Sequence, residues 1–146
     1  MLVYSTAPLA ADLEITGPVS LVLYASSSAP DTDFTATLAD VHPSGQSIHI
    51  CEGIVRARFR DSYEEPVLIE PGRVYKYEIS LWETSNLFRT GHRIRVEISS
   101  SNFPRFDRNL NTGQVPGLDT EMAAAHQTIY HDSQYPSHLL LPVIPR

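Results

Sequence analysis

The amino-acid sequence predicts an all-β protein built as a sandwich of two packed sheets. Apolar and polar residues alternate with a period of two in several segments, which is typical of strands with one buried face. Turn signals rich in glycine and proline separate these segments at short intervals. Eleven prolines would interrupt long helices. Without helices to cover a sheet, the two sheets must cover each other.

The clearest strands are residues 74–81 and 93–100, in which every second residue is apolar. The same alternation predicts strands at residues 19–26 and 34–39. Weaker candidates, short and rich in β-branched or aromatic residues, are residues 48–50, 54–60, 127–130 and 139–143. The total is about eight strands. The residues expected to face the core are Val19, Leu21, Leu23, Ala25, Phe34, Ala36, Leu38, Tyr75, Tyr77, Ile79, Leu81, Ile94, Val96 and Ile98.

The connections between these strands carry recognisable turn chemistry. Glycine or proline marks turns at residues 16–18, 43–45, 70–72 and 90–91. Only residues 119–126 could hold a helical turn or two, and an irregular loop is equally consistent with that segment.

Length and composition favour one domain spanning residues 1–146 that folds alone, because 42% of the residues are hydrophobic and only 19% are charged. The formal charge of −6 argues against a nucleic-acid partner. No apolar run is long enough for a membrane helix, and the start of the chain lacks signal-peptide features, so a cytoplasmic location without membrane contact is expected. The single cysteine, Cys51, cannot form an intrachain disulfide and is expected to be a small buried residue.

A run of three serines, Ser99 to Ser101, raises the question of a nucleophile. A serine hydrolase of the α/β type presents its serine on a tight strand-to-helix elbow with flanking glycines. Here no glycine flanks the serines, and Pro104 follows at once. We therefore expect the serines to finish a strand, and we expect no catalytic residue in this chain.

No metal or cofactor site is predicted. The six histidines are scattered, without a metal-binding spacing, and are expected in loops or at the surface. The carboxylate pairs could serve as acid and base, and the first pair could ligate calcium, but local capping in loops is the favoured interpretation. These pairs are Asp31 with Asp33, Glu64 with Glu65, and Asp107 with Asp132.

Five residues are candidates for a ligand or domain interface: Trp82, Phe103, Arg105, Phe106 and Arg108. Trp82 is expected to close the strand at residues 74–81. The aromatic residues could stack on a sugar, fill the space between the sheets or contact another domain. The two arginines are expected to hold their loop through local ion pairs with the intervening aspartate.

Several phrases, in this order, resemble a known family: "APLAADLEITGPVSLVLYASSSAPDTDFTATLADVHPSG", "GIVRARFRDS", "EPGRVYKYEISLWETSNLFRTGHRIRVEISSSNFPRFDRNLNTG" and "QTIYHDSQYPSHLLLPVIP". The chain resembles the C-terminal domain of the X-Pro dipeptidyl-peptidase and cocaine esterase (CocE/NonD) serine hydrolases. The resemblance implies a jelly-roll sandwich of the galactose-binding-like kind. It also implies that the catalytic serine, aspartate and histidine belong to a preceding α/β-hydrolase domain, since no triad position has a counterpart here.

Three functions follow as hypotheses, of which a small hydrolase in its own right is disfavoured because the sequence shows no nucleophile with a plausible base. The first is a non-catalytic accessory domain that packs on an α/β-hydrolase domain in cis or in trans, or that forms a homodimer if it stands alone. The alternative is a freestanding module that binds a carbohydrate or another small ligand. Family members are several times longer than this chain, so an excised domain, a truncated frame and a small natural protein all remain open.

Overall fold

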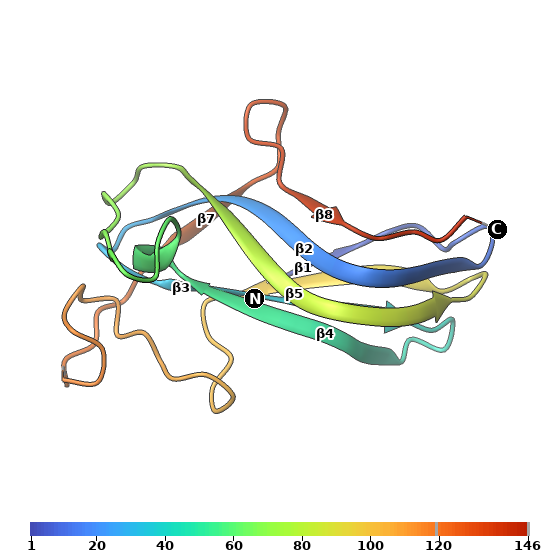
Figure 1. Ribbon diagram of the computed structural model, residues 1–146, viewed down its shortest axis with the longest axis horizontal. Coiled ribbons are helices and arrows are strands. Elements are labelled where there is room, and N and C mark those ends of the chain that lie inside the picture. The colour runs from blue at the N-terminus through green and yellow to red at the C-terminus, as the bar shows by residue number, and fades with distance from the viewer. Residues whose placement is uncertain (119, 146) are drawn as a thin grey trace.

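Two antiparallel sheets face each other in the computed structural model, which describes residues 1–118 and 120–145 (Figure 1). The elements are β1 (Leu2–Ser5), β2 (Leu13–Ser27), β3 (Asp33–Val41), β4 (Ser47–Arg56), η1 (Ala57–Phe59), β5 (Tyr75–Phe88), β6 (Arg93–Ser99), β7 (Gln127–Tyr130) and β8 (His138–Leu140). The predicted all-β jelly-roll sandwich of about eight strands is confirmed.

The first sheet has the strand order β1-β6-β3-β4. The second is arranged around β2, which pairs with β5 along one side and with β7 and β8 in turn along the other. β2 can serve both neighbours because it is 15 residues long. β3 and β4 form a hairpin, whereas the other strand pairings join segments that are far apart in the chain. The two longest connections, residues 57–74 and the segment between β6 and β7, lie at the same end of the sandwich (Figure 1).

The core lies between the inner faces of the sheets and follows the predicted alternation. Leu23 of β2, Leu38 of β3 and Ile79 of β5 have no exposed surface. The rings of Phe34 and Tyr77 meet across the core with centroids 4.9 Å apart. All the predicted core residues are buried except Tyr75 and Ile94, which are half-buried and pack against the core cluster.

Two strand predictions are corrected. Residues 48–50 and 54–60 were expected as separate strands, but one strand, β4, contains residues 48–50 and 54–56, and residues 57–59 form η1. β1 was not predicted, because all four of its residues are exposed and so its sequence shows no alternation of burial. It joins the first sheet by pairing with β6.

A bulge between β2 and β5 explains two further corrections. Residues 16–18 were expected to form a turn but lie inside β2, and Trp82 was expected to close a strand that in fact continues to Phe88. Pro18 pairs with Glu83 and Ser20 with Ser80, so Leu81 and Trp82 together oppose a single β2 residue. Trp82 has a positive φ of 67°. The extra residue inverts the alternation, and the sequence pattern is lost at that point.

The remaining turn predictions are confirmed: residues 43–45, 70–72 and 90–91 form turns between strands. Residues 120–126 form no helix, and Asp119 lies outside the described residues. No helix among the described residues is long and apolar enough to cross a membrane.

The two sheets meet along one edge, where β4 lies against β5. A Cβ atom added to Gly53 of β4 would lie 1.9 Å from the backbone oxygen of Ser80 and 3.3 Å from Cγ2 of Ile79. Only glycine lets the two backbones come this close. We call this β4–β5 side the closed edge of the sandwich.

We expect Gly53→Ala to lower the free energy of unfolding by about 3 kcal/mol, because the new methyl group must push β5 away from β4. Urea denaturation measures the loss. Gly45→Ala is the matched control, since nothing lies within 4 Å of its added Cβ. Because Gly45 has a positive φ, alanine at this position should still lower the free energy of unfolding by about 1 kcal/mol. Equal losses in the two variants would contradict the close approach at Gly53.

Candidate functional site

The edge opposite the closed edge leaves an apolar groove, which we call the open groove. It has a volume of about 360 Å³. It lies between β1 and β6 of one sheet and β2, β7 and β8 of the other, and its lining is predominantly apolar. The lining residues are Tyr4, Ser5, Thr6, Leu21, Ile94, Val96, Ile98, Ile129, His131, Ser137, His138 and Leu139. The open groove can bury apolar surface of a partner, but it offers few polar groups to orient a small ligand.

The serine run has no assembled catalytic partners within residues 1–118 and 120–145. Ser99 is the last residue of β6, and its backbone oxygen accepts a hydrogen bond from the Thr35 hydroxyl at 3.3 Å. Among the described residues, no hydrogen bond joins a side chain of this run to a histidine. The ion pair of His92 with Asp40 lies at the opposite end of β6, roughly 20 Å away along the strand. The serines therefore end a strand, as the sequence analysis expected.

Cys51 is buried on β4 and cannot replace them as a nucleophile. Burial raises the pKa of its thiol to about 11, so the thiol stays protonated near neutral pH. A protonated, buried thiol is a weak nucleophile and a poor metal ligand.

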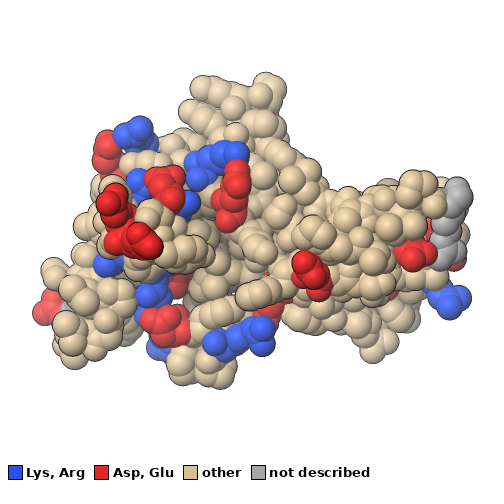
Figure 2. All heavy atoms as spheres, viewed as in Figure 1, with Lys and Arg blue, Asp and Glu red and all other residues tan. Residues whose placement is uncertain are grey.

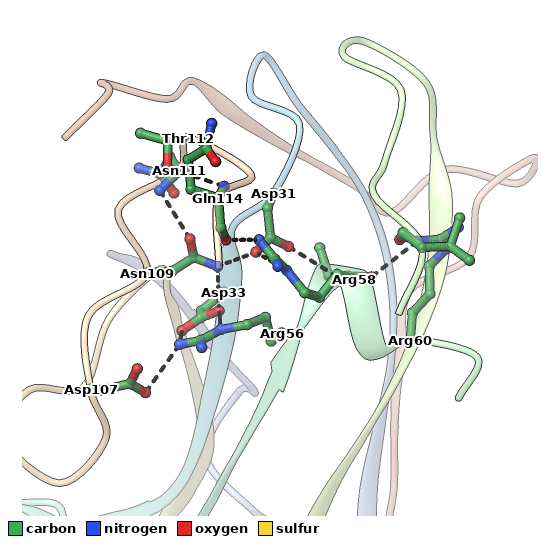
Figure 3. A network of polar contacts seen from close by, with 12 residues as sticks. Asp31, Asp33, Arg56, Arg58, Arg60, Asp107, Asn109, Asn111, Thr112 and Gln114 are labelled. Atoms are coloured by element: carbon green, nitrogen blue, oxygen red, sulfur yellow. Dashed lines mark hydrogen bonds and ion pairs between the residues drawn. The ribbon is translucent and has the colours of Figure 1, made fainter. Parts of the chain in front are cut away.

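At the end of the sandwich where β3 begins and β4 ends, a buried network joins two aspartates to two arginines (Figure 3). Asp33 accepts a bidentate pair of hydrogen bonds from Nε and Nη2 of Arg56 at 2.9 and 3.0 Å. Asp31 accepts from Nε of Arg58 at 2.8 Å and from the Arg58 backbone N–H at 3.0 Å. The hydrogen bonds to Asp33 raise the pKa of Arg56 further above its ordinary value. Both carboxylates are almost fully buried, so their charges depend on these partners.

The same network holds the long loop, by which we mean residues 100–126 between β6 and β7. Nδ2 of Asn109 donates to both Asp31 and Asp33 at 2.9 Å. Nη2 of Arg56 reaches Asp107 at 3.0 Å, and Nη2 of Arg58 donates to the backbone oxygen of Gln114 at 2.8 Å. The long loop thus takes its conformation from charged side chains at the strand ends. The expectation that Asp31 and Asp33 cap their own loop locally is wrong, because their partners lie 23 or more residues away in sequence.

Four of the five interface candidates share the long loop. Phe103 is 59% exposed and lies under the Arg108 guanidinium, 4.7 Å from ring centroid to Cζ. Arg105 pairs with Glu52 of β4 at 2.6 Å, and its guanidinium lies 5.7 Å from the half-buried ring of Phe106. The expected local pairing of both arginines with Asp107 is wrong, because Asp107 binds Arg56.

Trp82 stands apart from the other four candidates. It projects from the bulge in β5 and is 71% exposed. Among the described residues, no hydrogen bond, ion pair or ring contact joins Trp82 to the long loop. The structure therefore does not gather the five candidates into one surface, although it leaves both Trp82 and Phe103 accessible to a partner.

One cluster was not anticipated by the sequence analysis. Asp40, His42 and His92 place their ligand-capable atoms within 4.8 Å of one another. The two histidines are 50 residues apart in sequence, which hides the cluster from any search for a short motif. The usable signal was the pairing of two predicted strands, residues 34–39 and 93–100, whose neighbouring ends carry these side chains.

Comparison with known proteins gives consistent matches along the chain. Residues 1–140 match the family model of the X-Pro dipeptidyl-peptidase C-terminal non-catalytic domain. Cocaine esterase from Rhodococcus sp. (strain MB1 Bresler) is 50% identical over 148 residues, which cover 100% of this chain and 26% of the esterase.

Solved structures agree in fold. An aminopeptidase from a marine sediment archaeon, Thaumarchaeota archaeon, superimposes with a TM-score of 0.89 at 31% identity, covering 99% of this chain and 26% of that protein. An α-amino acid ester hydrolase superimposes with a TM-score of 0.90 at 30% identity, covering 98% of this chain and 25% of that protein. The chain therefore spans about a quarter of the length of the relatives it matches.

We expect Asp33→Ala to lower the free energy of unfolding by about 3 kcal/mol, because it leaves the largely buried Arg56 guanidinium without its bidentate partner. Amide hydrogen exchange in residues 102–117 should also become faster, since Asn109 loses one of its two acceptors. Urea denaturation and exchange mass spectrometry measure the two effects.

Glu70→Ala is the control for this prediction. Glu70 pairs with Arg73 at the surface, where both side chains are well exposed and solvent screens the pair, so almost no loss of stability is expected. If Asp33→Ala and Glu70→Ala proved equally stable, the network would have no structural role.

Proposed function

The chain belongs to the family of X-Pro dipeptidyl-peptidase C-terminal non-catalytic domains, and on that premise we propose that it is an accessory domain of a serine hydrolase that cleaves esters or peptides. The observation that carries the proposal is the combination of a match over residues 1–140 with relatives about four times as long. In this proposal the α/β-hydrolase region supplies the nucleophile and its base, and the sandwich supplies a rigid surface on which that region packs.

The open groove is the surface we assign to the catalytic region. A large exposed apolar surface is typical of a site where another protein surface binds. The apolar surface of the open groove continues onto β1, where Leu2, Val3 and Tyr4 are all exposed. In the relatives the remaining three quarters of the polypeptide is covalently attached to this domain. That part of the chain is therefore present at a high effective concentration and can bind the groove. On the face that Figure 2 shows, charged side chains gather at the end of the molecule that carries η1 and the long loop.

The long loop is the second contact we propose. Its anchoring by Asp31, Asp33 and their arginines fixes its shape before any partner arrives, and a preformed loop loses less entropy on binding. Phe103 and Arg105 are exposed on this loop and would extend the interface beyond the groove. Trp82 is exposed on β5, at the closed edge, and is not part of this contact.

We expect the purified chain to show no turnover of a 4-nitrophenyl ester above the buffer rate, because no side chain of the Ser99 to Ser101 run is hydrogen-bonded to a histidine among the described residues. A chromogenic assay with and without a fluorophosphonate inhibitor measures this. Turnover that a single serine-to-alanine substitution abolishes would contradict the accessory role and indicate a hydrolase in its own right.

We expect the chain to bind the catalytic region of the Rhodococcus cocaine esterase prepared without its last quarter, and Tyr4→Asp to weaken that binding at least tenfold. The substitution places a charge in the open groove, and Tyr4 is exposed enough for the fold to survive. Isothermal titration calorimetry measures the affinity.

Val67→Asp is the control, because Val67 is exposed outside the groove. Sedimentation of the chain alone detects homodimers that would compete for the same surface. Equal binding by Tyr4→Asp and wild type would contradict the assignment of the groove. A response to sugars in tryptophan fluorescence, together with no binding to the catalytic region, would favour a carbohydrate-binding module.

A further inference from the structure

Asp40, His42 and His92 meet at the end of the sandwich remote from the long loop, where the β3–β4 turn and the β5–β6 turn lie side by side (Figure 1). The pairing of β3 with β6 ends with Val41 opposite Arg93. The next residues outward on the two strands are His42 and His92, so their side chains lie on the same face. Asp40 precedes His42 by two residues and shares that face. Strand pairing thus produces the cluster without any local motif.

The ligand-capable atoms of the three side chains lie close enough together to bind the same small ion. Nδ1 of His92 lies 2.9 and 3.0 Å from the two carboxylate oxygens of Asp40. Nε2 of His42 lies 3.8 Å from Oδ2 of the same carboxylate. The two imidazole rings are 4.3 Å apart between centroids. Both histidines therefore direct a ring nitrogen toward one carboxylate.

Burial differs across the cluster in a way that suits a bound ion. The Asp40 side chain is 8% exposed and that of His92 is 13% exposed, whereas His42 is 38% exposed. A buried carboxylate offers a strong charge in a poorly solvated place, and the exposed histidine leaves a path for an ion and for water. Arg93 and Arg95 line a pocket together with His42, and both have hydrogen-bond partners outside the cluster: Arg93 donates to the backbone oxygen of Thr6 at 2.8 Å, and Arg95 to the Ser5 hydroxyl at 3.1 Å.

We propose that Asp40, His42 and His92 bind a divalent transition-metal ion, through one carboxylate oxygen, Nε2 of His42 and Nδ1 of His92. Two imidazoles with one carboxylate suit zinc and the neighbouring first-row ions, whereas calcium and magnesium prefer oxygen ligands. Three protein ligands leave a coordination position for water. His92 would carry its remaining ring proton on Nε2.

The geometry is close to what zinc requires. Ligand atoms about 2.0 to 2.1 Å from a tetrahedral zinc ion lie roughly 3.3 Å from one another. The 3.8 Å separation between His42 and Asp40 would close by about half an ångström, and the 2.9 Å separation between His92 and Asp40 would open by a similar amount. Rotation of the partly exposed His42 side chain supplies such a movement. The bound ion would tie the β3–β4 turn to the β5–β6 turn.

The test is zinc binding by isothermal titration calorimetry, on the full chain prepared without a polyhistidine tag. We expect one zinc ion per chain and a melting temperature that rises with zinc concentration. His42→Ala and Asp40→Asn should each weaken zinc binding at least tenfold, since even the loss of a residue that only orients a ligand costs about ten- to a hundredfold. His126→Ala, at an exposed position elsewhere, should bind zinc like the wild type.

Cobalt(II) in place of zinc gives an independent readout, because its visible absorption is much stronger in a tetrahedral protein site than in water, and this strong band should be lost in His42→Ala. His42 lies in an exposed turn, so this variant stays folded even if Asp40→Asn does not. Absence of zinc binding, or equal affinity in wild type and His42→Ala, would overturn the proposal. Either result leaves the accessory role untouched, because Asp40, His42 and His92 do not line the open groove.

Discussion

The sandwich depends on the contact between the backbones of β4 and β5 at Gly53, where no side chain separates the two sheets. Elsewhere, two sheets in a sandwich stand about 10 Å apart because side chains fill the space between them. With one edge closed to backbone contact, the pair of sheets forms a wedge. The opposite edge, between β1 and the strands β7 and β8, then stays open as an apolar groove. A domain of this shape leaves apolar surface for a neighbour to cover.

The two ends of the wedge are held by different chemistry. At one end, buried aspartates and arginines tie the long loop to β3 and β4, and each charge there is balanced by a partner. At the other end, the turns of the β3–β4 and β5–β6 connections meet around one buried carboxylate and two histidines. Because both clusters are buried, substitution of one charged partner should destabilise the fold, since it leaves the other charge uncompensated in a poorly solvated place.

The candidate site was only partly predictable. Composition and position identified Phe103, Arg105, Phe106 and Arg108 as loop residues, and the structure places them in one loop, with Phe106 half-buried. Their partners were not predictable, because Arg105 binds Glu52 and Asp107 binds Arg56 across about 50 residues of sequence. Ion pairs form between side chains that are close in space. The folded chain brings these partners together although they are far apart in sequence. Trp82 illustrates the same limit, since it lies at a bulge where the alternation that predicts the first half of β5 ends.

What the sequence determined by itself was which residues of each clear strand face inward. Alternation is a local property of extended backbone, so Leu23, Leu38 and Ile79 could be assigned to the core before any strand was paired. Tertiary structure alone decided that residues 16–18 continue β2, that the edge strand β1 joins β6, and that His42 comes to lie opposite His92. These outcomes depend on strand pairing between segments far apart in the chain, where register and bulges are set by packing of the whole sandwich and leave no pattern in a short stretch of residues.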